Sequence, residues 1–141
     1  MISAHNTVYR YRYMPTFHTV SSPFTWPRAF HTSELPLLFN TLPSGVSFLD
    51  YEALASKYMQ DAWVTFAKDP EDGLKKQKGW PKYSPEQKAL VELFPGWVRD
   101  ANVPIAQRGE GIVRFVETKV YDEACKNPPR IPWEQLLPVN R

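Results

Sequence analysis

The strongest periodic pattern of apolar and polar positions lies over residues 50–68. Its apolar side chains recur three or four positions apart, at Ala55, Met59, Ala62, Trp63 and Phe66. This spacing places them on one face of a helix, where such a stripe normally packs into a core. Ser47 or Asp50 has a side chain that can cap the first turn, and Asp69-Pro70 ends the pattern. The sequence therefore predicts an amphipathic helix over residues 50–68.

Two shorter segments alternate with the period of two that is typical of β-strands. In residues 7–13 the tyrosines at positions 9, 11 and 13 share one face, and Val8, Arg10 and Arg12 share the other. Pro15 ends this first strand. Residues 111–117 form the second, with β-branched and aromatic side chains at their apolar positions. We expect the sheet neighbours of the first strand not to lie upstream in this chain.

The segment between the long helix and the second strand is marked by charged residues and prolines. Residues 71–78 carry several lysines and Gly73, which favours an exposed loop with a solvated surface. Ser84-Pro85-Glu86-Gln87 has the local signals of a helix start: Ser can cap, Pro suits the first helical position, and Gln follows three residues after the cap. A helix that begins near residue 84 is therefore one interpretation of this segment.

Composition adds that the chain is rich in turns. Its 141 residues, 43% of them hydrophobic, could supply one packed core, but 14 prolines are spread over the whole length. This is about twice the average use of proline, and the prolines repeatedly interrupt regular structure. We therefore expect a single partial domain over residues 1–141 that belongs to a larger fold, with a Pro-rich peripheral tail at 126–141.

Charge and motifs exclude several classes of function. Seventeen basic and fifteen acidic residues are interspersed along the chain, so nothing indicates nucleic acid or an anionic membrane as a partner. No apolar run could span a bilayer, and no signal peptide is visible, which leaves the compartment unknown. The histidines at positions 5, 18 and 31 and the single Cys125 lack the spacing of a zinc site. Nucleotide-binding glycine loops are absent too, so we expect no metal and no cofactor.

One segment resembles a known family. Phe30-His31-Thr32-Ser33-Glu34-Leu35-Pro36-Leu37-Leu38-Phe39 is similar to the histidine segment of type-B carboxylesterases and cholinesterases. Further segments are similar to fungal members in the same order, at residues 56–70, 79–85 and 113–125. The resemblance spans residues 7–125. Asn40 stands where the family usually has glycine after the phenylalanine, and Asn also accepts left-handed backbone angles.

The resemblance implies the C-terminal portion of an α/β-hydrolase fold: late sheet strands, a histidine loop, a long helix and a loop-rich tail, with an incomplete sheet. It also implies a turn near Ser84 and then a strand at 89–93, in place of a helix start. In this family a serine attacks the ester carbonyl, and His31 would be the general acid and base. Glu34 matches a neighbouring structural glutamate, so it has a supporting role and is not the triad acid.

The rest of an esterase site is missing from the chain. No Gly-x-Ser-x-Gly elbow occurs, and Ser33, Ser44 and Ser47 lack its flanking glycine pair. Because the triad order is serine, acid and then histidine, the resemblance places the nucleophile and the acid before Met1. A small ester would be the substrate of the complete enzyme, whereas the isolated chain should be inactive and poorly stable. A truncated gene model or a degenerate gene copy would explain such a chain.

Two other functions stay open. The first is a non-catalytic interaction module derived from the cholinesterase-like fold, whose apolar surface binds the missing N-terminal part or a second copy. The second takes the alternating Tyr and Arg residues at 9–13 as a stacking platform for single-stranded nucleic acid or a sugar. Because the alternation puts tyrosines and arginines on opposite faces, a half-buried strand suits this segment better.

Overall fold

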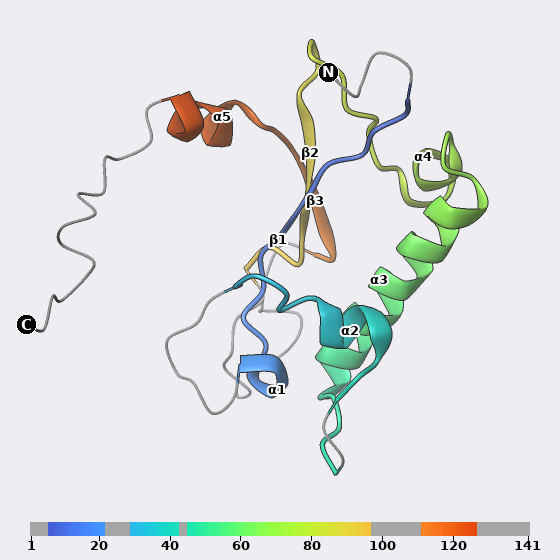
Figure 1. Cartoon of the computed structure of the whole chain (residues 1–141), viewed down its shortest axis with the longest axis vertical. Coiled ribbons are helices and arrows are strands. Elements are labelled where there is room, and N and C mark those ends of the chain that lie inside the picture. Colours follow the sequence, from blue (N-terminus) through green and yellow to red (C-terminus); the bar gives the residue numbers. More distant parts are fainter. Residues whose placement is uncertain (1–5, 22–28, 43–44, 97–110, 127–141) are drawn as a thin grey trace, which may run out of the picture.

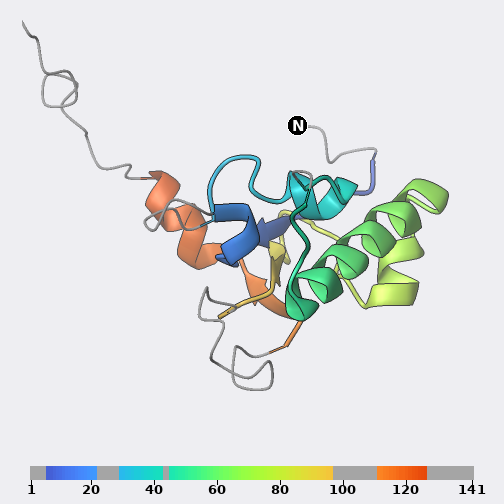
Figure 2. The ribbon, with the colours of Figure 1, turned by 90° about the horizontal axis from the view of Figure 1, so that it is seen from below.

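The computed structural model describes residues 6–21, 29–42, 45–96 and 111–126. Its sheet consists of β1 (Tyr11–Tyr13), β2 (Ala89–Leu93) and β3 (Val113–Glu117) (Figure 1). The helices are α1 (His18–Ser21), α2 (Leu35–Phe39), α3 (Asp50–Lys68), α4 (Gly73–Lys78) and α5 (Lys119–Lys126). Figure 2 shows the sheet between α5 on one side and α3 with α4 on the other. The α/β class that the sequence predicts is confirmed, and the predicted tail beyond Lys126 lies outside the described residues.

The sheet is mixed, and its strands follow the order β1-β2-β3. β1 runs parallel to β2, with Tyr11 opposite Val91. β3 runs antiparallel to β2, with Val113 opposite Leu93. In the described part of the chain, β2 therefore has a partner on each side, whereas β1 and β3 are the edges.

Both predicted strands exist, but each is shorter than its alternating pattern. The strand expected over residues 7–13 extends only over Tyr11–Tyr13, although the carbonyl of the preceding Arg10 already accepts a hydrogen bond of 3.0 Å from the Val91 amide of β2. Earlier in the chain, the carbonyl of Val8 accepts a hydrogen bond of 2.8 Å from the amide of Tyr83, which lies in the loop before β2. In the parallel register that pairs Tyr11 with Val91, the first residue of β2, Ala89, lies opposite Tyr9, so Thr7 and Val8 have no partner in the ladder. The strand expected at 111–117 is confirmed as β3.

The two faces of β1 meet different helices, as the alternation of Tyr and Arg predicts. On one face, the ring of Tyr11 packs edge-on against Trp63 of α3, with ring centres 5.1 Å apart. On the other face, the Arg12 guanidinium lies over the ring of Tyr121 of α5, 4.2 Å from its centre. Aromatic and cation–π contacts of this kind hold the short strand between the two helices.

α3 has the bounds that its periodic pattern predicts, and Ala55, Met59 and Ala62 of its apolar stripe are fully buried in the core. Its predicted caps are wrong. Leu49 occupies the cap position, and Asp50 is already the first residue of the helix. The amides at the start of α3 find their acceptor elsewhere, in a carboxylate inside the first turn.

That carboxylate belongs to Glu52, which is fully buried. It accepts hydrogen bonds from the amides of Leu49 and Thr19, both at 3.0 Å, and from the hydroxyl of Thr19. A buried carboxylate is tolerated when its oxygens are hydrogen-bonded in this way. Glu52 therefore caps α3 and at the same time fastens α1 to it.

The loop predicted over residues 71–78 is wrong, because most of this segment forms α4. Gly73 serves close packing here: a Cβ atom at this position would lie 2.8 Å from the carbonyl oxygen of Thr65 in α3. Only glycine allows the two helices to approach so closely. Leu74 is the buried apolar side chain of α4. Gly79, with a φ of 71°, ends the helix in the left-handed conformation.

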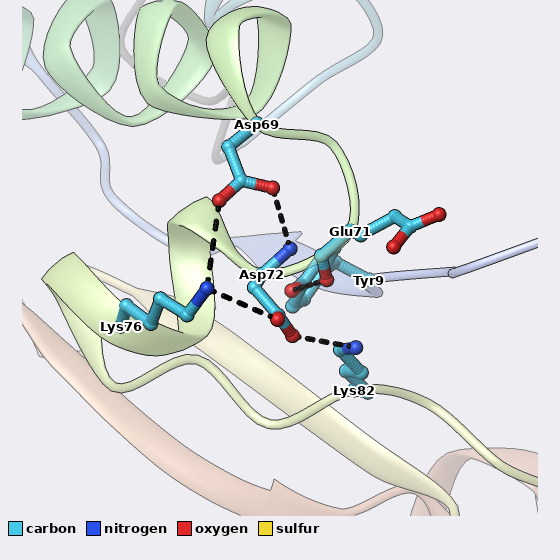
Figure 3. Close-up of polar contacts among 6 residues, drawn as sticks. All are labelled: Tyr9, Asp69, Glu71, Asp72, Lys76 and Lys82. Atoms are coloured by element: carbon cyan, nitrogen blue, oxygen red, sulfur yellow. Dashed lines mark hydrogen bonds and ion pairs between the residues drawn. The ribbon is translucent and has the colours of Figure 1, made fainter.

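A cluster of ion pairs fixes α4 between α3 and the segment that leads to β2 (Figure 3). The Asp72 carboxylate lies 2.8 Å from Lys82 Nζ and 3.1 Å from Lys76 Nζ. Asp69 accepts a hydrogen bond of 2.9 Å from the Asp72 amide. The hydrogen bonds from Lys82 and Lys76 lower the pKa of Asp72 to about 2. Exposed pairs contribute little stability one by one, so the main effect of the cluster is to orient the turn between α3 and α4.

The segment at residues 84–87 is a turn followed by a strand, as the family resemblance implies. Ser84 Oγ accepts a hydrogen bond of 3.1 Å from the Gln87 amide, so the local cap signal is satisfied. Lys88 then adopts a left-handed φ of 45°, and β2 follows directly. A left-handed residue ends a helical turn, which is why no helix grows from this cap.

A buried carboxylate lies on the central strand β2. Glu92 is only 1% exposed; one of its oxygens lies 2.6 Å from Arg114 of β3, and the other accepts a hydrogen bond from Tyr121 of α5. Burial by itself raises the pKa of Glu92, but the hydrogen bonds from Tyr121 and Arg114 outweigh burial and leave the pKa below its ordinary value. Folding therefore favours the ionised form.

In a Glu92→Gln variant, the free energy of unfolding is expected to fall less steeply as the pH is lowered. A carboxyl group with a lowered pKa contributes stability above its ordinary pKa of 4.5, and this contribution is lost as the pH falls through the lower folded value. Urea denaturation at several pH values from about 6 to about 3 measures the effect. The native chain should lose more stability over this interval than the variant, and equal slopes would show that Glu92 is not held in its charged form.

Candidate active site

The histidine segment forms a tight turn directly before α2. The Ser33 amide donates to the Phe30 carbonyl at 3.0 Å, and Ser33 Oγ accepts from the Phe30 amide at 3.2 Å. Ser33 is buried, whereas His31 is exposed. The side chain of Ser33 thus closes the turn that presents His31 to solvent.

The backbone around His31 is sharply bent. Thr32 has a φ of 71°, which is unusual for a β-branched residue, and its carbonyl accepts a hydrogen bond of 3.0 Å from the Leu35 amide. At the other end of α2, Asn40 has a φ of 52°, and its amide bonds to the Pro36 carbonyl. The expectation that asparagine takes the left-handed position after Phe39 is confirmed.

α2 is anchored to α3 by apolar and polar contacts. Leu37 is fully buried, and its carbonyl accepts hydrogen bonds from Ser56 Oγ at 2.6 Å and from Gln60 Nε2 at 3.3 Å. Ser56 and Gln60 are one helical turn apart, on the same face of α3. Because α2 follows the histidine turn directly, this anchor fixes the position of His31 relative to the core.

Glu34 is half-buried at the end of the histidine turn. It occupies the cap position of α2 without making a side-chain cap. Burial raises the pKa of Tyr11 and Tyr13, and the negative charge of Glu34 raises both further. Within the described ranges, no hydrogen bond or ion pair joins Glu34 to His31.

Apolar side chains are exposed beside His31. Phe30 and Leu35 are partly exposed, and Phe39 is 66% exposed. Leu35 and Phe39 are four residues apart in α2, on the side opposite the buried Leu37. The sequence shows these residues only as one apolar run, because the packing of α2 on α3 decides which of them become buried. An exposed apolar surface next to a histidine suits a hydrophobic substrate group or a protein partner.

The other candidate residues are dispersed over the chain. His18 begins α1, Ser47 is exposed before α3, and Cys125 lies in α5. His5 and Ser44 lie outside the described residues. In the part that the structure describes, no three His, Cys, Asp or Glu side chains come together as a metal site. No described helix is both long and apolar enough to cross a membrane.

The histidine turn, α2 and α3 all lie within residues 1–100, and these residues match the family model described as the Carboxylesterase family. The chain belongs to the carboxylesterase family. Secreted lipase 5 of Gibberella zeae is 42% identical over 89 residues, which are 62% of this chain and 16% of the lipase. Chlorogenic acid esterase of Aspergillus niger is 41% identical over 71 residues, which are 50% of this chain and 14% of the esterase. No solved structure matches the chain.

Membership of the carboxylesterase family implies an α/β-hydrolase fold, and the mixed sheet with helices on both faces agrees with part of such a fold. The matched regions make up no more than 16% of either relative. This carboxylesterase-family chain therefore corresponds to a small part of the fungal proteins that it resembles.

A Thr32→Gly variant of this carboxylesterase-family chain is expected to be more stable by about 1 kcal/mol, because a left-handed conformation costs other residues about 1–2 kcal/mol and costs glycine little. Urea denaturation measures the change. The control is Thr41→Gly, at an exposed threonine outside the helices that does not have a positive φ. That substitution should leave stability unchanged or lower it. An equal loss in both variants would show that Thr32 is not strained.

Proposed function

We propose that this chain is the C-terminal part of a carboxylic-ester hydrolase and supplies His31 as the general acid and base of the reaction. The observation that carries the proposal is the presentation of His31, which is exposed on a turn closed by Ser33 and held on α3 through α2. Membership of the carboxylesterase family and the fungal lipase and esterase relatives support ester chemistry. Exposure suits a histidine whose reaction partners come from another part of the enzyme.

In the proposed reaction, a serine hydroxyl from the rest of the enzyme attacks the carbonyl carbon of a small ester. The imidazole of His31 takes the serine proton as the new C–O bond forms, and it gives that proton to the alcohol as the ester C–O bond breaks. Water then repeats both steps on the acyl-serine, which releases the carboxylic acid and restores the serine. Backbone amides of the missing part would hold the oxyanion, and its acidic residue would orient the imidazole.

In this proposal no neighbour of His31 serves as the serine nucleophile or as the triad acid. The sequence has no Gly-x-Ser-x-Gly elbow, and the nearby Ser33 is buried and engaged in closing the turn. The charge of Glu34 raises the pKa of Tyr11 and Tyr13, which suits a supporting role. The isolated chain should therefore not hydrolyse esters, because a single imidazole without nucleophile or oxyanion hole gives little catalysis.

Hydrolysis of p-nitrophenyl butyrate by the purified chain and by its His31→Ala variant tests this expectation. Neither protein should exceed the rate of the buffer alone. Activity in the native chain that disappears in the variant would reveal a nucleophile within these residues, and the proposal of a severed part would be wrong. The complementary test uses a hybrid enzyme, defined as Secreted lipase 5 of Gibberella zeae with its matching segment replaced by the corresponding residues of this chain.

A non-catalytic interaction module is the second candidate, and the exposure of Phe39 favours it. Such a module would fold on its own and associate through the apolar side of α2. Circular dichroism and analytical ultracentrifugation distinguish the two candidates. A folded, inert chain whose self-association is lost in Phe39→Ser would favour the module, whereas a poorly folded chain would favour the severed esterase part.

A further inference from the structure

A pocket of about 270 Å³ lies away from the histidine turn, between the residues that lead into β1 and the second half of α3. Aromatic rings dominate its lining: Tyr9, Tyr11, Trp63, Phe66 and Trp80. We define these five residues as the aromatic pocket. The remaining lining side chains are small or uncharged, so no described residue of the pocket carries a formal charge.

The rings cross one another nearly at right angles. Tyr11 meets Trp63 at 77°, Tyr9 meets Phe66 at 87°, and Trp63 meets Trp80 at 90°. This arrangement offers ring faces and ring edges around one space. A planar ring that enters can stack on one wall and meet the edge of another, which are the two favourable geometries for aromatic pairs.

Hydrogen bonds to groups outside the pocket hold two of the walls. The Tyr9 hydroxyl donates to the Glu71 carbonyl at 2.8 Å, beside the ion-pair cluster of Asp72 (Figure 3). Trp80 Nε1 donates to the Tyr58 hydroxyl at 2.9 Å. Both rings are therefore fixed before any ligand arrives, and a preformed wall lowers the entropic cost of binding.

Size and charge select the ligand. The volume is just below the range of about 300–1,000 Å³ that drug-sized ligands occupy, which suits one ring or two fused rings. An uncharged lining offers no partner for an ionised group, and burying such a group without one is costly. We propose that the aromatic pocket binds a neutral aromatic molecule of one ring or two fused rings. This inference goes beyond the proposed function and does not depend on the chemistry of His31.

Equilibrium titration with 2-naphthol, followed by ligand-observed NMR, tests the proposal in both the isolated chain and the hybrid enzyme. 2-Naphthol should bind saturably, and its charged counterpart 2-naphthoate should bind at least about tenfold more weakly. Phe66→Ala should weaken binding by about tenfold, because it removes one aromatic wall. Val64→Ala is the matched control: Val64 is also exposed on α3 but does not line the pocket, so this variant should stay within about twofold.

A second variant keeps the test decisive if Phe66→Ala disturbs the fold. Thr7→Leu adds side-chain volume to a half-buried wall of the pocket without removing a ring and outside the packed core, and it should also weaken binding while circular dichroism stays native. Equal binding by the Phe66 and Val64 variants, or no saturable binding in either protein, would overturn the proposal. If the isolated chain bound 2-naphthol but the hybrid enzyme did not, a side chain from the rest of the enzyme would fill the pocket, and the proposal would be wrong. Binding that appears only on dilution would assign it to a second copy.

Discussion

Replacing His31 with alanine in the hybrid enzyme is expected to lower kcat/KM for p-nitrophenyl butyrate by about 10⁴-fold or more. Without the imidazole, no group accepts the serine proton or returns it to the alcohol. Stability should hardly change, because the side chain of His31 is exposed and Ser33 and α2 hold the turn. Steady-state kinetics and thermal unfolding of the same samples separate lost chemistry from lost folding.

Two neighbours of His31 serve as matched controls for that measurement. Glu34→Gln removes a carboxylate three residues away and should stay within about tenfold of the unchanged hybrid, because in the proposed reaction the triad acid comes from another part of the enzyme. Ser33→Ala should have a moderate effect through the shape of the turn. If Ser33→Ala or Glu34→Gln abolished activity as completely as His31→Ala while the protein stayed folded, the assignment of roles in this turn would be wrong.

Trp80→Ala is expected to cause the largest loss of stability among the substitutions considered, about 3–5 kcal/mol. Trp80 is 2% exposed, its ring packs edge-on against Trp63, and its indole N–H bonds to the Tyr58 hydroxyl. Truncation removes one wall of the aromatic pocket, leaves a cavity there, and removes the donor of a partly buried hydrogen bond. Urea denaturation of the hybrid enzyme and its Trp80→Ala variant, followed by circular dichroism, measures the change.

Phe39→Ala is the control for Trp80→Ala, because it truncates an aromatic ring that is 66% exposed. Its effect should be about 0.5 kcal/mol or less. Trp80→Phe should fall between the two, since it keeps most of the apolar contact and loses the hydrogen bond to Tyr58. If Trp80→Ala cost no more than Phe39→Ala, the packing of Trp80 in the hybrid enzyme would differ from the structure described here.

The elements that the sequence predicts correctly are those whose pattern is long or unambiguous. The stripe of α3 extends over several turns, so its bounds follow from periodicity alone. α4 is missed because Gly73 is a loop signal by itself, and only the proximity of Thr65 explains why a glycine belongs there. The first strand is overestimated because alternation describes one chain, whereas a ladder also needs a partner of equal length.

In the candidate site, too, some features follow from the sequence and others do not. His31 is identified through the resemblance of its segment, and Asn40 is correctly expected in the left-handed position. Two features are not visible in the sequence: the positive φ of Thr32 and the effect of the Glu34 charge on the pKa of Tyr11. Each depends on how separate segments pack together, which no local pattern records. The hydrogen bonds from Ser56 and Gln60 that anchor α2 are hidden for the same reason.

The buried carboxylate of Glu52 also has a consequence for the order of folding. Its bond to the Leu49 amide closes a loop of three residues, whereas its bonds to Thr19 span 33 residues. Short loops close at lower entropic cost than long ones, and local contacts form earlier. α3 should therefore form first, with the Leu49 amide already bonded to the Glu52 carboxylate. α1 should dock later, when the Thr19 amide bonds to the other oxygen of that carboxylate. Early amide protection in α3, followed later by protection of Thr19, is the hydrogen-exchange pattern that this order produces.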